Sequence, residues 1–410
     1  MEKTLKKRKP LSLPKRRENK PERLSGKRLK NLFPYAQKGK IDMPFFILVI
    51  ALLTVGLIMM FSASFVSALY NTASHDSLYY IKRQLVFAVA GVAGMFLVSA
   101  IDYKLIRKLT LPLLIVTIAL LIIVRLLPPV DGVYRWINLG MFTIQPSEIA
   151  KFTIIAVLAH LIALHPDRMN SFKFIALLVG VIGIFVVMLM LEKHLSGTIL
   201  IFAIGLCMLY AGGIWNKYKI AAPAIAIFGI AVLAFLIYII YKNPGINEHA
   251  FIRVKSWLDK DYDPLGARWQ TNNSLYAIGS GGLLGSGLGQ SMQKYLYVSE
   301  PQNDFIFAIV CEELGFVGAI LILFTFCLLI GRGVMIAKSA KNNYASLLTM
   351  GIVFQVGIQV ILNVAVVTDT IPNTGISLPF FSYGGTSLLM LLLEMGVVLS
   401  VSRTARMEKI

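Results

Sequence analysis

Runs of about 20 apolar residues recur along the 410-residue chain, and they constrain its fold more than any other feature. Hydrophobic residues make up 57% of the sequence, whereas a soluble domain is usually less than half apolar. In hydrocarbon such a run satisfies its backbone hydrogen bonds only as a helix. We therefore predict an all-α polytopic membrane protein. Its ten expected transmembrane helices are residues 44–69, 84–101, 109–127, 148–165, 174–191, 198–212, 220–241, 304–330, 345–367 and 385–402.

The basic residues predict the orientation of these helices. Residues 1–41 contain 15 Lys or Arg and three Glu. Such an arm could suggest nucleic-acid binding, but beside a membrane span it favours a cytoplasmic N-terminus in contact with anionic lipid. We predict no nucleic-acid partner, a disordered cytoplasmic arm over 1–42, a membrane domain over 43–403 and a cytoplasmic tail over 404–410. Because the number of spans is even, both termini are expected in the cytoplasm.

One connection is much longer than the others. Residues 242–303 join the seventh and eighth predicted helices, and this orientation makes them a large extracytoplasmic loop. The loop carries Arg253, Arg268 and Lys294 together with a glycine run over 279–289. Arginine and lysine could hold a phosphate-bearing group, and glycines allow the backbone close to a ligand. Contact between these basic residues and lipid headgroups is an equal alternative.

Acidic residues lie where this loop enters the eighth helix. Asp304 stands at the junction, and Glu312 and Glu313 follow about 12 Å deeper at the rise of an α-helix. Ionisable groups at membrane depth are candidates for function. Asp304 could instead cap the helix, because an Asp side chain accepts hydrogen bonds from free backbone N–H groups. Glu312 and Glu313 could equally form polar pairs that only stabilise the helix bundle.

Two further segments stand at the same predicted face. In the first, Arg135-Trp136 precedes Gln145-Pro-Ser-Glu148, and Glu148 is three residues from Lys151, so that the two can pair on one helix face. In the second, residues 371–387 contain prolines and glycines that block a continuous helix. Irregular backbone near a membrane is tolerated where it lines a cavity, so this segment is a candidate cavity wall.

In this chain context, several strings resemble those of the shape, elongation, division and sporulation (SEDS) family, which includes FtsW, RodA and SpoVE. The resemblance spans about residues 43–403, and the long basic arm favours the division branch. This sequence departs from the family pattern at Lys193-His-Leu-Ser-Gly-Thr198, where many members have an aspartate. The matching strings are Arg135-Trp136, Gln145-Pro-Ser-Glu148, Gly281-Gly282 with Gly285, Gly287 and Gly289, Asp304-Phe-Ile-Phe-Ala308, Glu312-Glu-Leu-Gly315 and Pro379-Phe-Phe-Ser-Tyr-Gly-Gly385.

The resemblance implies ten helices and an enzyme that polymerises lipid II into glycan strands, with Asp304 as the essential acidic residue. It also implies a class B penicillin-binding protein as partner, other division proteins, a place in the inner membrane at the septum, and Mg²⁺ or Mn²⁺ as a candidate cofactor with no metal ligands assigned. A lipid II flippase and a scaffold that activates the penicillin-binding protein are the alternatives. The candidates are Asp304 for catalysis; Arg253, Lys294, Gln270, Ser274, Gly282 and Ser382 for substrate binding; and Arg135, Glu148, Lys151, Glu312 and Pro379 for support.

Overall fold

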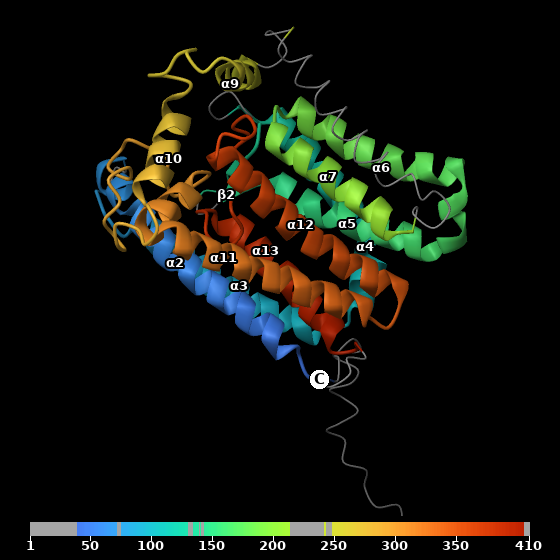
Figure 1. The fold of residues 1–410 in the computed structure, drawn as a ribbon. Coiled ribbons are helices and arrows are strands. Elements are labelled where there is room, and N and C mark those ends of the chain that lie inside the picture. The colour runs from blue at the N-terminus through green and yellow to red at the C-terminus, as the bar shows by residue number, and fades with distance from the viewer. Residues whose placement is uncertain are drawn as a thin grey trace, which may run out of the picture. The chain divides into compact units, whose positions relative to one another are not determined.

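The computed structural model describes residues 39–71, 75–129, 134–138, 140, 143–213, 242 and 248–405. The regular secondary structure of this part of the chain is helical apart from one short antiparallel strand pair, β1 with β2. Figure 1 shows the helices side by side as a bundle, with α9 and α10 at one end of it. The elements are α2 (Met43–Asn71), α3 (Tyr79–Ala100), α4 (Tyr103–Leu126), β1 (Ile137–Asn138), β2 (Thr143–Ile144), α5 (Pro146–Leu164), η1 (Pro166–Asn170), α6 (Phe172–Leu191), α7 (Leu195–Ala211), α9 (Glu248–Leu258), α10 (Trp269–Ser280), α11 (Ile306–Lys338), α12 (Asn343–Val367) and α13 (Gly385–Ser402).

Each predicted span in the described segments corresponds to an observed helix, although α3 and α4 begin five and six residues earlier than predicted and α11 ends eight residues later. Eight helices of the described segments are long and apolar enough to cross a membrane, and α7 is a shorter apolar helix at the sixth predicted position. The predicted span 220–241 and the basic arm lie outside the described residues, so the count of ten remains a prediction. The predicted large loop 242–303 contains two helices, α9 and α10.

Helix α13 lies largely inside the bundle and makes its most extensive contacts with α3. Two glycines allow these helices to approach closely. A Cβ atom on Gly91 would lie 2.5 Å from Leu392 Cδ1, and one on Gly396 would lie 2.7 Å from the Met95 carbonyl oxygen. Small residues serve helix packing in membranes because lipid tails provide no hydrophobic drive for helices to associate.

Helix α11 is broken at Gly315, whose φ of 68° and ψ of −172° are not helical. The break frees backbone groups, and the glycine run binds them. Ser286 N–H and Gly287 N–H donate to the carbonyls of Glu312 and Glu313, at 2.9 and 3.0 Å. In return, Phe316 N–H donates to the Gly282 carbonyl at 2.9 Å. The glycine run therefore completes the hydrogen bonding of a kinked membrane helix, as the hydrocarbon environment requires.

The kink predicts that Gly315 tolerates no side chain. A Cβ atom there would lie 2.3 Å from the Gly285 backbone nitrogen, and φ is in the left-handed region. Gly315→Ala should lower the free energy of unfolding by on the order of 1–3 kcal/mol, the usual cost of such strain. Gly331→Ala is the matched control, because Gly331 lies on the same helix with nothing within 4 Å of its Cβ position. Thermal melting in detergent measures both, and equal melting temperatures would contradict the proposed need for glycine at the kink.

Candidate functional site

Asp304 lies two residues before α11, in the segment that joins α10 to α11. Its backbone carbonyl accepts a hydrogen bond from Asn363 Nδ2 at 2.8 Å, which fixes the chain at this point. The N-cap position of α11 is Phe305, and no side chain caps it. The alternative in which Asp304 caps the helix is therefore wrong. Among the described residues, the Asp304 carboxylate has no hydrogen-bond partner, which leaves it available to a ligand.

The backbone of the segment between α12 and α13 approaches this carboxylate closely. Gly375 has φ +75°, and a Cβ atom there would lie 3.0 Å from Asp304 Oδ2 and 3.6 Å from Arg253 Nη1. Arg253, on α9, is half-buried, and its Nη1 donates to the Asn373 carbonyl at 3.5 Å. Residues from three distant parts of the sequence thus meet at Asp304, and Gly375 leaves room for the carboxylate and the guanidinium.

A second arginine acts on the same carboxylate. Burial raises the pKa of Asp304 above its ordinary value, and the positive charges of Arg253 and Arg135 oppose that rise. Burial lowers the pKa of Arg135 to about 10, and the neighbouring Arg253 lowers it as well. Arg135 Nη2 donates to the Lys193 carbonyl at 3.3 Å, while its Nε is buried without a hydrogen-bond partner among the described residues. The charges of two incompletely bonded guanidinium groups therefore act on one carboxylate, and such groups can bind an anion such as a phosphate.

The neighbouring side chains of Glu192 and His194 do not cancel the positive charge of Arg135. Burial raises the pKa of Glu192 to about 8, although Arg135 opposes this rise, so Glu192 is largely protonated at neutral pH. Burial lowers the pKa of His194, and the charges of Arg135 and Lys151 lower it further, so His194 is neutral there. Glu192 Oε1 and His194 Nδ1 are also buried without hydrogen-bond partners in the described segments. Arg135 therefore keeps an excess of positive charge for a bound anion.

A groove lies beside Arg253, between α9, α10 and the end of α12. Its floor contains the ion pair of Arg268 with Asp369, and Arg268 Nη1 also donates to the Ser256 carbonyl at 2.7 Å. Trp257 Nε1 donates to the Asp369 carbonyl at 3.1 Å. Gln270 lines this groove and is half-buried, so it stays a candidate for substrate contact, whereas the guanidinium of Arg268 is occupied.

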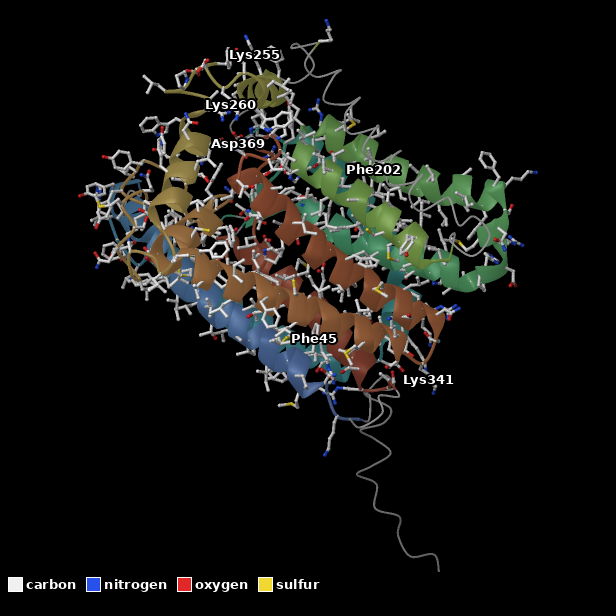
Figure 2. All side chains as sticks on the ribbon, in the orientation of Figure 1. Phe45, Phe202, Lys255, Lys260, Lys341 and Asp369 are labelled. Carbon is white, nitrogen blue, oxygen red and sulfur yellow. The ribbon has the colours of Figure 1, made fainter. Side chains whose placement is uncertain are left out.

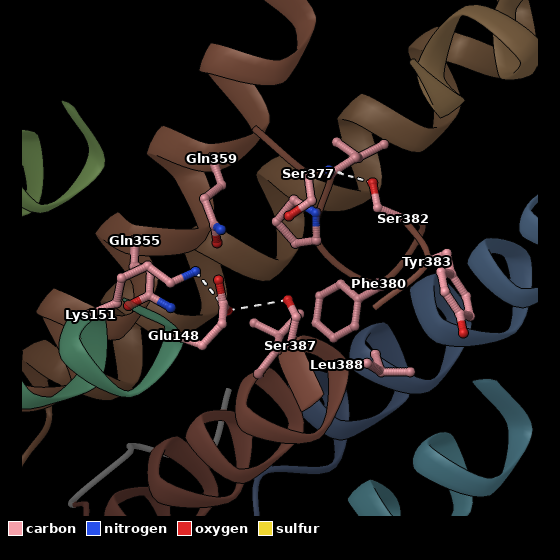
Figure 3. Close-up of a pocket in the computed structure, with 13 residues that line it drawn as sticks. Glu148, Lys151, Gln355, Gln359, Ser377, Phe380, Ser382, Tyr383, Ser387 and Leu388 are labelled. Carbon is pink, nitrogen blue, oxygen red and sulfur yellow. Dashed lines mark hydrogen bonds and ion pairs between the residues drawn. The ribbon is translucent and has the colours of Figure 1, made fainter. Parts of the chain in front are cut away.

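A second cavity lies deeper, among α5, α12, α13 and the irregular segment 371–384 (Figure 3). Lys151 Nζ lies 2.9 Å from Glu148 Oε2, and Ser387 Oγ donates to the same oxygen at 3.2 Å. Pro379 lines the wall, which makes the segment a cavity wall as predicted. Nearby, Gln355 Nε2 on α12 donates to Glu394 Oε2 at 2.7 Å, a partner that the sequence of α13 alone could not reveal.

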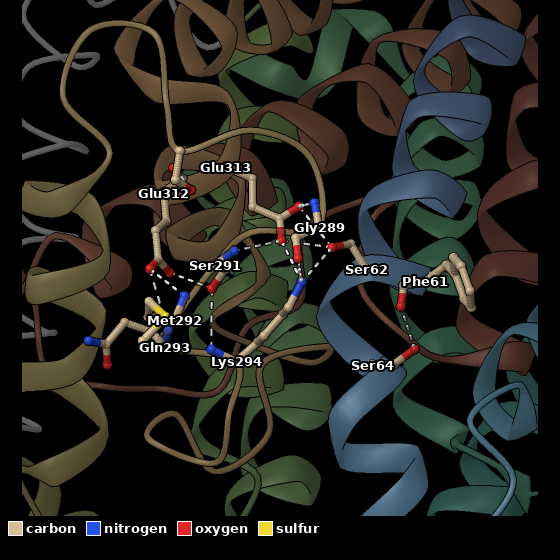
Figure 4. A network of polar contacts seen from close by, with 11 residues as sticks. Phe61, Ser62, Ser64, Gly289, Ser291, Met292, Gln293, Lys294, Glu312 and Glu313 are labelled. Carbon is tan, nitrogen blue, oxygen red and sulfur yellow. Dashed lines mark hydrogen bonds and ion pairs between the residues drawn. The ribbon is translucent and has the colours of Figure 1, made fainter.

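Lys294 differs from its expected role in substrate binding. Its side chain is 4% exposed, and its ammonium donates to Gly289 O, Glu313 Oε1 and Ser62 Oγ at 2.6, 3.0 and 3.3 Å. Figure 4 shows this network between α2 and α11, with Glu312 and Glu313 pointing toward the loop. A lysine that is buried and fully bonded in this way has no donor left for a phosphate, so Lys294 supports the structure.

Three other predicted substrate contacts also have structural partners. Ser274 Oγ is buried and donates to the Val367 carbonyl at 2.9 Å. Ser382 Oγ donates to the Asn303 carbonyl at 2.7 Å and accepts from Leu378 N–H at 2.8 Å. Gly282 belongs to the turn on the α11 kink. These contacts give the three residues structural roles, and their part in substrate binding stays a prediction.

The sequence predicted only some of the residues that act on the Asp304 carboxylate. The sequence named Arg253 and Asp304 as functional and Arg135 as a supporting residue, but it gave no reason to bring Arg135 to the carboxylate. It also passed over Glu192 and His194. The signal available was their place at the turn between two predicted spans, where a Glu, a Lys and a His follow one another next to a membrane.

Comparison with known proteins gives a consistent set of relatives. A family model described as a cell cycle protein, covering FtsW, RodA and SpoVE, matches residues 43–407. The stage V sporulation protein E of Bacillus subtilis is 40% identical over 379 residues, which cover 90% of this chain and 99% of that protein. A probable peptidoglycan glycosyltransferase FtsW of Trichlorobacter lovleyi is 36% identical over 370 residues, which cover 89% of this chain and 93% of the relative.

Two solved structures share the fold. One chain, from work on the structural coordination of polymerization and crosslinking by a peptidoglycan synthase complex, matches with a TM-score of 0.70 and 25% identity. The match covers 88% of this chain and 98% of that one. The rod shape determining protein RodA of Thermus thermophilus matches with a TM-score of 0.64 and 24% identity, over 90% and 98% of the two chains.

The network around Lys294 predicts a stability effect. Lys294→Met leaves the buried Glu313 carboxylate without its counter-charge, and breaking a buried pair in this way typically costs roughly 3 kcal/mol or more. The melting temperature of the purified protein should fall clearly, and Glu313→Gln in the same chain should restore part of it. Lys260→Met, an exposed lysine, is the control and should melt normally. If the Lys294→Met protein melts normally but fails to bind substrate, Lys294 contacts the substrate and the structural role is wrong.

Proposed function

This chain belongs to the FtsW, RodA and SpoVE family of cell cycle proteins, and we propose that it is a peptidoglycan glycosyltransferase that polymerises lipid II into glycan strands. The donor is then a sugar linked to a lipid through pyrophosphate, and the acceptor is a sugar 4-hydroxyl. The names of the FtsW relatives support a place in septal wall synthesis during cell division.

One observation carries this proposal: among the described residues the Asp304 carboxylate has no hydrogen-bond partner, and the charges of two incompletely bonded arginines, Arg253 and Arg135, act on it. Glycosyl transfer needs a base for the acceptor and positive charge for the departing pyrophosphate. Asp304 meets the first need, because the charges of Arg253 and Arg135 oppose the rise in its pKa that burial causes and so favour its carboxylate form. Arg253 and Arg135 meet the second need.

The reaction follows from these positions. Asp304 takes the proton of the 4-hydroxyl while the hydroxyl oxygen bonds to the anomeric carbon of the donor. The bond from that carbon to the pyrophosphate breaks on the opposite side, so the anomeric centre is inverted. Arginine binds phosphate oxygens in pairs through its planar fork, and this stabilises the charge on the leaving group. A positioned general base contributes about 10²–10⁴-fold to such a step.

Mg²⁺ or Mn²⁺ is a proposed cofactor. The described residues contain no group of three or more His, Cys, Asp or Glu side chains that could hold a metal ion. Mg²⁺ often takes one or two carboxylates and completes its shell with substrate phosphates and water, and Asp304 with the pyrophosphate of lipid II fits that pattern. A divalent ion would screen the charge of the pyrophosphate.

The reaction is proposed for the outer face of the cytoplasmic membrane. Figure 2 shows Lys255, Lys260 and Asp369 at one end of the bundle and Lys341 at the other. The loop with Lys338 and Lys341 is among those whose basic residues favour the cytoplasm, so Asp304 would lie outside. The synthase-complex structure supports a class B penicillin-binding protein as partner. The long apolar helices support contact with membrane lipid.

Asp304→Asn tests the catalytic assignment. The amide has the same shape but cannot accept the hydroxyl proton, so the variant should lose lipid II polymerisation by about 10²-fold or more. Because Asp304 does not cap α11, the variant should insert and melt as the wild type does. The measurement is glycan formation from lipid II by the purified protein together with a penicillin-binding partner that lacks crosslinking activity.

Glu300→Gln is the matched control for this variant. Glu300 is an exposed carboxylate four residues before Asp304, and its side chain accepts from Asn303 Nδ2 at 2.6 Å. It should retain polymerisation. Glycan formation by Asp304→Asn at more than about a tenth of the wild-type rate would defeat the role of Asp304 as base.

Arg253→Gln tests the arginine through the pH dependence. Arg253 lowers the pKa of Asp304, so its removal should raise that pKa further. Since the base acts as a carboxylate, activity is lost as pH falls through this pKa, and the acidic limb of the rate profile should move to higher pH. The rate at the optimum should also fall, by on the order of 10²-fold, as a pyrophosphate contact is lost.

Lys255→Gln controls for the loss of a positive charge from the same helix. Lys255 faces the ring of Tyr262 at 4.0 Å and has no described contact with Asp304. An Arg253→Gln profile with an unmoved acidic limb and a normal rate would assign Arg253 to contacts with lipid headgroups.

A further inference from the structure

Two polar contacts between α2 and α11 mark the ends of an uncharged stretch that has nearly the same length on both helices. Arg332 Nη2 lies 2.8 Å from Asp42 Oδ2 at one end, and Ser62 Oγ donates to Glu313 Oε1 at 2.7 Å at the other. At the rise of an α-helix, the stretch between them is about 29 Å on α11 and about 30 Å on α2. Residues 43–61 and 314–331 contain no charged side chain. A hydrocarbon core is about 30 Å thick, so these contacts mark its two boundaries.

The glycine-rich segment is attached at the boundary marked by Glu313. Phe316 and Val317 N–H donate to the carbonyls of Gly282 and Leu283 at 2.9 and 3.1 Å. The carboxylates of Glu312 and Glu313 accept from backbone N–H groups further along the segment. These donors are Gly289, Ser291, Met292 and Gln293. Because these backbone groups are bonded, irregular chain can lie at this level of the membrane.

The side chains that this segment turns outward are apolar. Leu283, Leu284, Leu288 and Met292 are 71, 80, 55 and 67% exposed. Residues 279–293 contain no charge, and the lysine that follows turns inward to Glu313. An apolar, uncharged surface of this kind is rare on a face that meets water.

The surroundings identify what covers this surface. Tyr276, Tyr295 and Tyr297 are exposed beside it, and tyrosine is enriched where a membrane meets water. Phe316 and Leu321 on α11 are also exposed, so the apolar surface continues onto a face of a membrane-spanning helix. Lipid covers such a face. Continuity with that face favours the bilayer over a protein partner as the occupant.

We infer that residues 282–297 form an interfacial lip seated in the leaflet on the Asp304 side of the membrane, with its leucines against acyl chains and its tyrosines at the headgroups. The lip ends seven residues before Asp304, so its contact with lipid holds the approach to Asp304 at the membrane surface. Contact between the lip and lipid does not depend on the reaction proposed above.

Fluorescence quenching in nanodiscs tests this inference. Leu284→Cys and Leu288→Cys are each made in a chain whose three cysteines are replaced by alanine and which polymerises lipid II like the wild type, and each is labelled with an environment-sensitive dye. A phospholipid with a nitroxide near the top of its acyl chain should quench both labels strongly, whereas aqueous iodide should quench them weakly. Lys260→Cys is the exposed control for iodide, and Leu321→Cys on α11 is the control for lipid.

Each outcome decides the matter. Strong quenching by the lipid nitroxide, with a blue-shifted emission, supports the lip. Quenching by iodide as strong as at position 260, without quenching by lipid, would place the lip in water and overturn it. Protection from both quenchers would mean that protein covers the surface, which would overturn it as well.

Discussion

The carboxylate of Glu313 holds together the parts of the protein on which the site depends. It accepts hydrogen bonds from Ser62 on α2, from Lys294, and from the backbone of Gly289 and Ser291. A buried charge is tolerated only when it is paired and bonded in this way. The break of α11 at Gly315 frees the neighbouring backbone groups, and the same loop satisfies them. The loop that leads to Asp304 is therefore fixed to two membrane helices rather than lying loosely over the bundle.

The polar groups of the candidate site, unlike those around Glu313, are incompletely hydrogen-bonded. Among the described residues, the Asp304 carboxylate has no hydrogen-bond partner, the Arg253 guanidinium has a single long hydrogen bond, and Arg135 keeps a buried nitrogen without a partner. Such incomplete bonding costs stability in a folded protein, so it is expected where a ligand completes it. A scaffold would need no such arrangement, although binding a penicillin-binding protein is compatible with it. A transporter would use polar groups near the middle of the membrane, and the buried pair of Gln355 with Glu394, halfway along α13, is a described feature of that kind.

The sequence predicted those properties that depend on local pattern. Apolar runs located the described membrane helices, the spacing of Glu148 and Lys151 predicted their pairing, and the prolines and glycines of 371–387 predicted an irregular wall. Contacts between distant segments could not be read in this way. Lys294 looks like any basic loop residue until its ammonium is seen beside Glu313, and Glu394 needs Gln355 from another helix. The proximity of Arg135 to Asp304 also depends on how the helices pack, and no periodicity encodes that.

Product analysis of the wild-type protein tests the central claim most directly. The purified chain and a penicillin-binding partner without crosslinking activity are placed in liposomes with fluorescent lipid II, and the length of the glycan and the position of the label are measured together. We predict glycan strands of many disaccharides, formed from lipid II on the side of the membrane that carries Asp304. Movement of unpolymerised lipid II across the bilayer, with no glycan formed, would contradict the assignment and identify a flippase instead.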